Sequence, residues 1–278
     1  MAVGDLKRLE LWARLGYAAR GFVYLLLGWI ALSTGRALST DDAVAEVEKL
    51  PGSSVLLPLL AAGLFGYALF KIYSAVVDLD HKGDNGKGRI TRLAQAIGGV
   101  GYLALGWLAL KVMTGDKGGA KSGQASGSGG SGQDTASDVA QAPGGDWLLI
   151  LAALVVIGVA ISQFVIAYKA KFMEQMPGAP RQVKPLGQLG YAARGLVIAM
   201  IGYFLLKAGM DGERVRSFGD VLALLRNDYG WLFKLVSAGL VAFGLTSLVM
   251  ARYRRIEDRD MAHDASRGID KAKASVKS

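Results

Sequence analysis

Residues 15–21 read LGYAARG, and the same seven letters return at residues 189–195. A third, partial copy keeps only the end of the motif, because residues 102–107 read YLALGW and residues 24–29 read YLLLGW. Self-similarity at long spacing indicates internal repeats. We therefore predict three tandem repeats and a short tail, with boundaries near residues 1–80, 81–175, 176–260 and 261–278.

Each repeat contains two apolar stretches long enough to cross a membrane. A hydrocarbon core about 30 Å thick takes roughly 20 helical residues. Six segments meet this requirement, at residues 13–34, 54–77, 93–113, 147–168, 188–208 and 230–251. The 38 glycines and the 52% of hydrophobic residues agree, since small residues let membrane helices approach one another closely. The predicted fold is an all-α integral membrane protein with six transmembrane helices.

Lysine and arginine are divided unevenly between the two sides of the predicted membrane. The N-terminus, the loops after the second and fourth spans, the C-terminus and the adjoining helix ends hold 22 of the 32 basic residues. Basic loops stay in the cytoplasm, so both termini are predicted to be cytoplasmic. Each repeat has an even number of spans, so the three repeats run in the same sense. Parallel repeats share an axis along the membrane normal, which predicts a pseudo-threefold bundle.

The loops that follow the first spans are predicted to differ between repeats. Ser217 with Asp220 resembles a capping box before an apolar-periodic stretch, and Ser39 with Asp42 begins a similar stretch. Both patterns predict short helices at the outer membrane surface. Residues 114–146 of repeat two are instead rich in Gly, Ser and Ala, which predicts a disordered outer loop.

Superposing the three first spans aligns small residues on one helix face. This predicted seam consists of Ala18, Gly21, Gly28, Ala96, Gly99, Gly106, Ala192, Gly195, Ala199 and Gly202. Lipid provides no hydrophobic drive for helix association, so close van der Waals contact across such a seam has to supply it. We expect the first spans to pack tightly around the central axis. The alternative is that the glycines line a narrow pathway or admit the flat surface of a ligand.

Arg20 and Arg194 occupy the same place in the repeated motif, inside apolar spans. Only 12 residues, none of them charged, separate Arg194 from Lys207. That is about 20 Å of helix, less than the hydrocarbon thickness, although both side chains are long enough to snorkel. We favour interfacial anchoring for both arginines. The functional alternative is a cytoplasmic-side site for an anion or a lipid headgroup, formed by Arg20, Arg194, Tyr17 and Tyr191.

Other polar residues in the spans receive structural interpretations. Polar residues deep in the second spans are expected to bond neighbouring helices, namely Ser162, Gln163, Thr246 and Ser247. Lys71 is expected to snorkel from the end of the second span. No Asp or Glu lies within a predicted span, so coupled transport lacks its most usual component. There is no cysteine, and the two histidines, His81 and His263, lie far apart. These absences predict no metal, no cofactor and no enzymatic activity.

The LGYAARG start, the glycine-aromatic pair seven residues after its last glycine, and ARYRRI at residues 251–256 together resemble a known family. It is the bacterial membrane protein family called domain-of-unknown-function 1206, and the resemblance covers roughly residues 8–256. It is weaker in repeat two, where Gly98 and Gly99 replace the Arg-Gly pair. The resemblance implies a bacterial inner-membrane protein with three hairpins, and it brings no activity with it.

Two functions remain open from the sequence. The first is a non-catalytic membrane module, which acts as a scaffold, as an accessory subunit with a protein partner, or as an organiser of anionic lipids at its basic cytoplasmic rim. The second is a passive channel or carrier for a small neutral or anionic solute. The net charge of +9 is spread over helix ends, which argues against a nucleic-acid partner.

Overall fold

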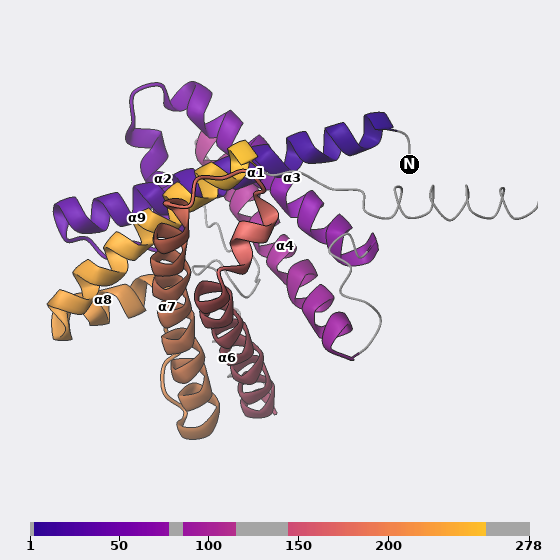
Figure 1. The fold of residues 1–278 in the computed structure, drawn as a ribbon. Helices are drawn as coiled ribbons and strands as arrows, with labels where there is room; N and C mark the ends of the chain where they lie inside the picture. Colours follow the sequence, from indigo (N-terminus) through magenta and orange to yellow (C-terminus); the bar gives the residue numbers. More distant parts are fainter. Residues whose placement is uncertain (1–2, 78–85, 115–143, 254–278) are drawn as a thin grey trace, which may run out of the picture.

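The computed structural model describes residues 3–77, 86–114 and 144–253, and these residues form helices joined by short loops (Figure 1). The all-α fold class is thereby confirmed for the described part of the chain. Its elements are α1 (Val3–Thr34), α2 (Thr40–Glu46), η1 (Val47–Lys49), α3 (Ser53–Val77), α4 (Gly86–Met113), α6 (Gly145–Lys169), η2 (Lys171–Gln175), α7 (Val183–Asp211), α8 (Phe218–Asp228) and α9 (Gly230–Tyr253).

Five helices are long and apolar enough to cross a membrane, namely α1, α3, α6, α7 and α9. The multi-pass membrane character predicted from the sequence is therefore supported at the level of five spans. The predicted span 93–113 lies in α4, whose apolar part is shorter and covers Gly98–Met113. Both α1 and α4 begin before the apolar stretches that we predicted, because a helix can continue through polar residues once it has left the hydrocarbon.

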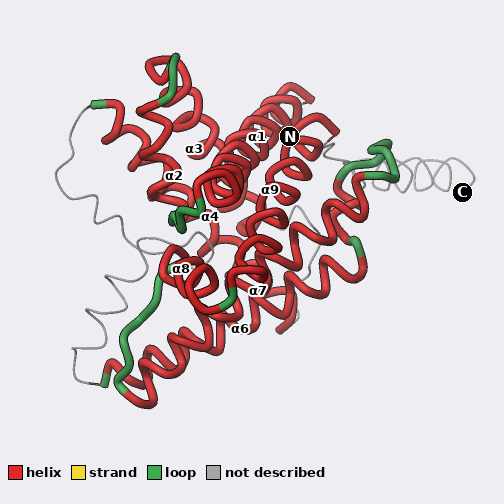
Figure 2. The backbone as a smooth tube through the Cα atoms, turned by 90° about the vertical axis from the view of Figure 1, so that its left-hand side faces the viewer, coloured by secondary structure: helices red, strands yellow, loops and turns green. Residues whose placement is uncertain are grey.

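Each first span packs against the second span of the preceding repeat: α1 against α9, α4 against α3, and α7 against α6. Within repeats one and three the two spans also pack together, as α1 with α3 and α7 with α9. Among the described residues, α4 and α6 of repeat two do not form such a pair. The six helices therefore form a row in the order α4, α3, α1, α9, α7, α6. The helices at its two ends, α4 and α6, do not pack against each other in the described residues. Figures 1 and 2 show α4 beside α3, and α6 beside α7.

The seam glycines lie against the second spans, whereas we expected them to face the other first spans. A methyl group placed on Gly28 of α1 would come 2.7 Å from the backbone nitrogen of Val241 in α9. The seam alanines are partly buried. Comparable close approaches join Gly21 to Gly244, Gly99 to Ile72, Gly106 to Phe65, Gly195 to Gln163, and Gly202 to Ile157. The first spans therefore use this face for the neighbouring repeat and not for a common axis.

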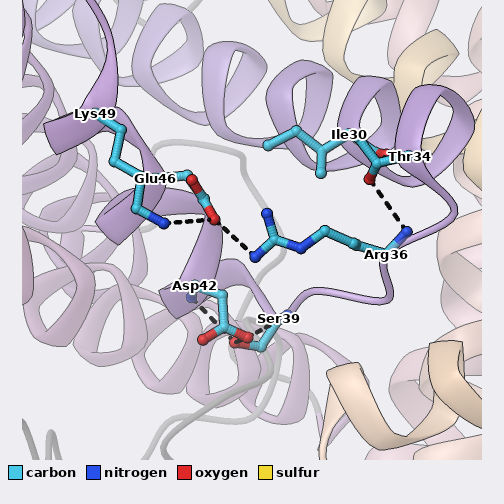
Figure 3. Close-up of polar contacts among 7 residues, drawn as sticks. All are labelled: Ile30, Thr34, Arg36, Ser39, Asp42, Glu46 and Lys49. Carbon is cyan, nitrogen blue, oxygen red and sulfur yellow. Dashed lines mark hydrogen bonds and ion pairs between the residues drawn. The ribbon is translucent and has the colours of Figure 1, made fainter.

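The two predicted short helices are present as α2 and α8, and both begin with a capping box, which the sequence predicted for α8. The Ser39 hydroxyl accepts a hydrogen bond from the backbone N–H of Asp42, and the Asp42 carboxylate accepts one from the N–H of Ser39 (Figure 3). Ser217 and Asp220 make the same reciprocal pair at α8. The apolar faces of both helices are buried, so α2 and α8 pack on the bundle. The predicted disordered loop 114–146 falls almost entirely outside the described residues.

Candidate functional site

Arg20 lies inside the helix bundle. Its side chain is on the same face of α1 as Tyr17 and Tyr24, since residues three and four apart are neighbours on a helix. The guanidinium is only 6% exposed. It donates to the hydroxyl of Tyr67 in α3 at 2.8 Å and to that of Ser247 in α9 at 3.0 Å. Interfacial anchoring, which we favoured from the sequence, is therefore wrong for Arg20: two neighbouring helices hold the side chain in the interior, and it does not snorkel.

Arg194 is also held by a tyrosine and a polar residue, but its tyrosine lies on a first span whereas that of Arg20 lies on a second span. Its Nε donates to the hydroxyl of Tyr24 in α1 at 3.1 Å, and its Nη1 donates to the Gln163 amide oxygen in α6 at 3.3 Å. Each arginine thus bonds one tyrosine and one polar residue from the second span of the preceding repeat. Gln163 and Ser247 do bond neighbouring helices, as the sequence predicted. The prediction was wrong for Ser162 and Thr246, whose hydroxyls donate to backbone carbonyls of their own helices.

Aromatic rings lie next to the cationic side chains of Arg20, Arg194 and Lys71. The Phe243 ring of α9 lies 4.9 Å from the Arg20 guanidinium carbon and 5.2 Å from that of Arg194, measured to the ring centroid. The Tyr67 ring has Arg20 at 5.3 Å and the Lys71 ammonium at 5.7 Å. A cation over an aromatic face gains about 0.5–2 kcal/mol. Arg20, Arg194 and Lys71 therefore alternate with two aromatic rings, and we call these five residues the cation–ring cluster.

Tyr17 and Tyr191, the other two predicted site residues, border this cluster. The Tyr17 ring lies 4.9 Å from the Arg20 guanidinium and meets the Tyr67 ring edge-on at 5.1 Å. Tyr191 meets the Phe243 ring in the same way at 5.0 Å. The structure thus brings all four predicted residues into one region, at the centre of the row of helices.

Sequence reasoning missed Tyr24, Tyr67, Tyr102, Phe243 and Lys71 as members of this region. A signal for two of them was present. Residues 62–64 and 238–240 both read AGL, so Tyr67 corresponds to Phe243 and Lys71 to Ser247. The second spans, aligned on this match, carry two aromatic residues at the same helix position beside the arginines.

The cluster is chemically suited to negative charge. Within the part of the chain that the structure describes, Arg20 contacts hydroxyls, a thioether and aromatic rings, and no carboxylate. The predicted spans contain no Asp or Glu that could neutralise it. Within the described ranges no three His, Cys, Asp or Glu residues gather as metal ligands would. The arrangement can hold an anion by charge and by N–H and O–H donation.

The comparisons with known proteins agree with the repeat structure. The family model described as Domain of Unknown Function (DUF1206) matches three segments, at residues 15–78, 93–170 and 189–254. The uncharacterized protein YxxB of Bacillus subtilis (strain 168) is 30% identical over 263 residues, which cover 89% of this chain and 92% of YxxB. No solved structure matches the chain.

Proposed function

Because this chain belongs to the family described as Domain of Unknown Function (DUF1206), which brings no activity with it, we propose a function from the site. We propose a non-catalytic protein of the bacterial inner membrane that binds the anionic headgroup of a lipid at the cation–ring cluster. Its role would be to organise anionic lipid, alone or as an accessory subunit of a membrane complex.

The observation that carries this proposal is the burial of Arg20 among neutral partners. A guanidinium at the centre of a membrane helix costs about 2.5–3.5 kcal/mol on insertion scales. Two hydrogen bonds and the ring contacts offset part of that cost, and they leave the positive charge itself unmatched. An anion bound beside the guanidinium would supply the missing counter-charge, which a merely structural residue would be expected to obtain from a carboxylate.

The proposed topology has six spans, with α4 as the third, and cytoplasmic termini. The 28 residues of α4 extend over about 42 Å, and α4 packs along α3. The excess of basic residues on the side of the termini supports this orientation. A periplasm-active reporter fused after Ser278 should then be silent, and one inserted near Gly129 should be active. The opposite pattern would reverse the orientation.

A second candidate function is passive passage of a small anionic solute. The observation in its favour is that the contacts of Arg20 come from α1, α3 and α9, so the cluster lies between helices and not on an outer surface. A lipid headgroup has to reach this place from the side, whereas a solute could reach it along the helices.

Purification in a mild non-ionic detergent, with native mass spectrometry of everything that co-elutes, tests both functions. The parent protein should retain an anionic phospholipid in preference to a zwitterionic one. The variants Arg20→Gln and Arg194→Gln should lose that preference. The control Lys234→Gln, at an exposed position near the start of α9, should keep it. A stoichiometric protein in the same eluate would identify the accessory-subunit role.

Equal retention of both lipid classes by the parent, or unchanged retention by both arginine variants, would contradict the lipid proposal. If the protein elutes without lipid, and proteoliposomes pass an anion that the Arg20→Gln and Arg194→Gln double variant blocks, the carrier is the correct function.

A further inference from the structure

The three second spans, α3, α6 and α9, can be compared position by position. Matching glycines of the first spans approach them at one place, in the pairs Gly106–Phe65, Gly28–Val241 and Gly202–Ile157. A second set of approaches agrees with this alignment, in the pairs Gly99–Ile72, Gly21–Leu248 and Gly195–Phe164. Contacts within the chain therefore show which residues of α3, α6 and α9 are equivalent.

The face that α3 and α9 turn to the first span of their own repeat is buried. α3 meets α1 through Gly63 and Gly66, and α9 meets α7 through Gly239. All three glycines are buried. Two turns after Gly63 and Gly239, the side chains of Phe70 and Thr246 are only 4% and 0% exposed. In repeats one and three, the first span thus covers this face of the second span.

The same face of α6 is exposed in the described part of the chain. Its equivalent positions are Val155, Gly158 and Ser162, and all three are exposed. Val155 is 44% exposed, and a methyl group placed on Gly158 would meet nothing within 4 Å. We call these three residues the uncovered face of α6.

The residues of the uncovered face are those of a helix contact. The neighbouring position Ile161 corresponds to Leu69 and Leu245, and all three are large, apolar and exposed, as contact with lipid chains favours. Gly158 and Ser162 are small, and small residues in membrane helices allow the close approach of another helix. A helix therefore fits the uncovered face better than lipid does.

The first span α4 has the complementary exposed surface. Its Leu93 and Val100 are 62% and 45% exposed, whereas the corresponding Leu15 and Phe22 of α1 are half-buried. In repeats one and three, a first span and the second span that follows it form the pair that covers both faces. The helix suited to cover α6 is thus α4.

The α4 helix of the same chain is held away from α6. A methyl group on Gly99 of α4 would come 3.1 Å from the carbonyl oxygen of Ala68 in α3, and one on Gly209 of α7 would come 2.8 Å from that of Asp146 in α6. Such close backbone contacts fix α4 on α3 and α6 on α7. Figure 1 shows the lower ends of α4 and α6 apart. A second copy of the chain can supply α4 without breaking either contact.

We propose that the protein forms a twofold homodimer in which α4 of each copy packs on the uncovered face of α6 of the other copy. A twofold axis along the membrane normal keeps both copies in the same orientation. α4 and α6 then meet antiparallel, as α1 and α3 do. One rotation forms both contacts, so the assembly closes at two copies. None of the five residues of the cation–ring cluster lies on α4 or α6, so this proposal and the lipid proposal can fail separately.

Crosslinking in the membrane tests the contact, and the chain has no cysteine of its own that would react. Ala19 approaches Gly63 in repeat one, and the corresponding positions are 97 on α4 and 155 on α6. Two differently tagged copies, one with Ile97→Cys and one with Val155→Cys, are co-expressed and treated with a short bis-maleimide. A product that carries both tags should form. Ile161→Cys in place of Val155→Cys is the matched control, and with it this product should be lost.

Light scattering of the full chain in a mild non-ionic detergent measures the assembly independently. The parent protein should be a dimer. Gly158→Leu should raise the dissociation constant of the dimer roughly tenfold or more. This variant should still fold, because the added side chain extends into open space. Ile161→Trp adds bulk next to the uncovered face and should leave the dimer intact.

Three results would overturn the homodimer. A crosslink within one chain that carries both Ile97→Cys and Val155→Cys, with none between copies, would mean that the chain covers the face with its own α4. A monomeric parent without the crosslink would mean that lipid covers the face. A dimer that Gly158→Leu does not weaken, or equal crosslinking from positions 155 and 161, would place the interface elsewhere.

Discussion

Repeats one and three close their two-helix units through matching contacts, whereas the two spans of repeat two stay apart. In repeat one, Gly16 of α1 lies against Tyr67 of α3, and Ala19 lies against Gly63. In repeat three the corresponding pairs are Gly190 with Phe243 and Ala193 with Gly239. Two repeats that share little more than a seven-residue motif therefore use the same close approaches.

Repeat two has larger residues at these places. The YLALGW alignment puts Ile97 at the position of Ala19. The pairs Gly106–Phe65 and Gly202–Ile157 align α3 with α6, and they put Val155 at the position of Gly63. The contacts of α4 and α6 with the neighbouring repeats therefore persist although the contact between these two helices is lost. The loss coincides with two buried groups that have no hydrogen-bond partner, Arg20 Nε and the Tyr102 hydroxyl.

The largest expected difference in stability is between two glycine variants. Gly190 lies at a close approach in repeat three, whereas Gly98 in repeat two faces open space. Gly190→Leu should prevent stable folding, because its Cβ alone would come 2.5 Å from the backbone nitrogen of Phe243. Overpacking against side chains costs about 1–3 kcal/mol, and backbone atoms can yield less. Gly98→Leu should change stability by less than about 0.5 kcal/mol. Size-exclusion chromatography and thermal unfolding in detergent measure both. Equal damage from the two variants would mean that the position of Gly98 is enclosed in the folded protein.

A smaller difference in stability is expected between variants of Tyr24 and Tyr102. Tyr24→Phe should destabilise the protein by about 2 kcal/mol, because Arg194 Nε loses a buried acceptor. Tyr102→Phe should be neutral or slightly stabilising in the absence of anion, because the removed hydroxyl has no protein partner. Thermal unfolding of both variants in the same detergent makes the comparison. A Tyr102→Phe variant as unstable as Tyr24→Phe would show that the Tyr102 hydroxyl also forms a hydrogen bond.

Local signals in the sequence were sufficient to predict where the short helices begin. They were not sufficient to predict side-chain partners that are distant in the sequence. The capping box at Ser217 involves residues three apart, so the sequence alone predicts it correctly, and the polar run from Ser39 correctly predicts the start of α2. Arg20 was recognised as a candidate from the repeat, but its partners Tyr67 and Ser247 are 47 and 227 residues away. Without those partners the side chain seemed to need the membrane surface, which is why the anchoring interpretation failed.

The third cation was missed for a related reason. Repeats one and three carry the arginine on their first spans, where repeat two has Gly98. Lys71 lies on a second span, in the repeat before the one that lacks the arginine. A symmetric site can thus be completed from the facing helix, and alignment of one helix set alone does not reveal it. The separation of α4 and α6 was likewise outside the reach of periodicity.

The smallest expected effect compares the surface helices α2 and α8. Their capping boxes align Asp41 with Gly219, so only repeat one has a carboxyl group at this position. Burial, together with the neighbouring Asp42, raises the pKa of Asp41 from its ordinary value of 3.8 to about 6. A raised pKa means that the folded protein favours the neutral acid. The contribution of Asp41 to stability is therefore fully present below pH 4 and is lost as the pH rises through 6.

Asp41→Asn keeps the shape and removes this ionisation. The variant and the parent should be equally stable near pH 4, and the variant should be more stable by about 1 kcal/mol at pH 7, after allowance for partial solvent screening. Thermal unfolding from pH 4 to 8 gives the difference at each pH. If the stability difference between variant and parent does not change with pH, the Asp41 carboxyl is hydrated in the folded protein. α2 then packs on the bundle less closely at this position than α8 does at Gly219.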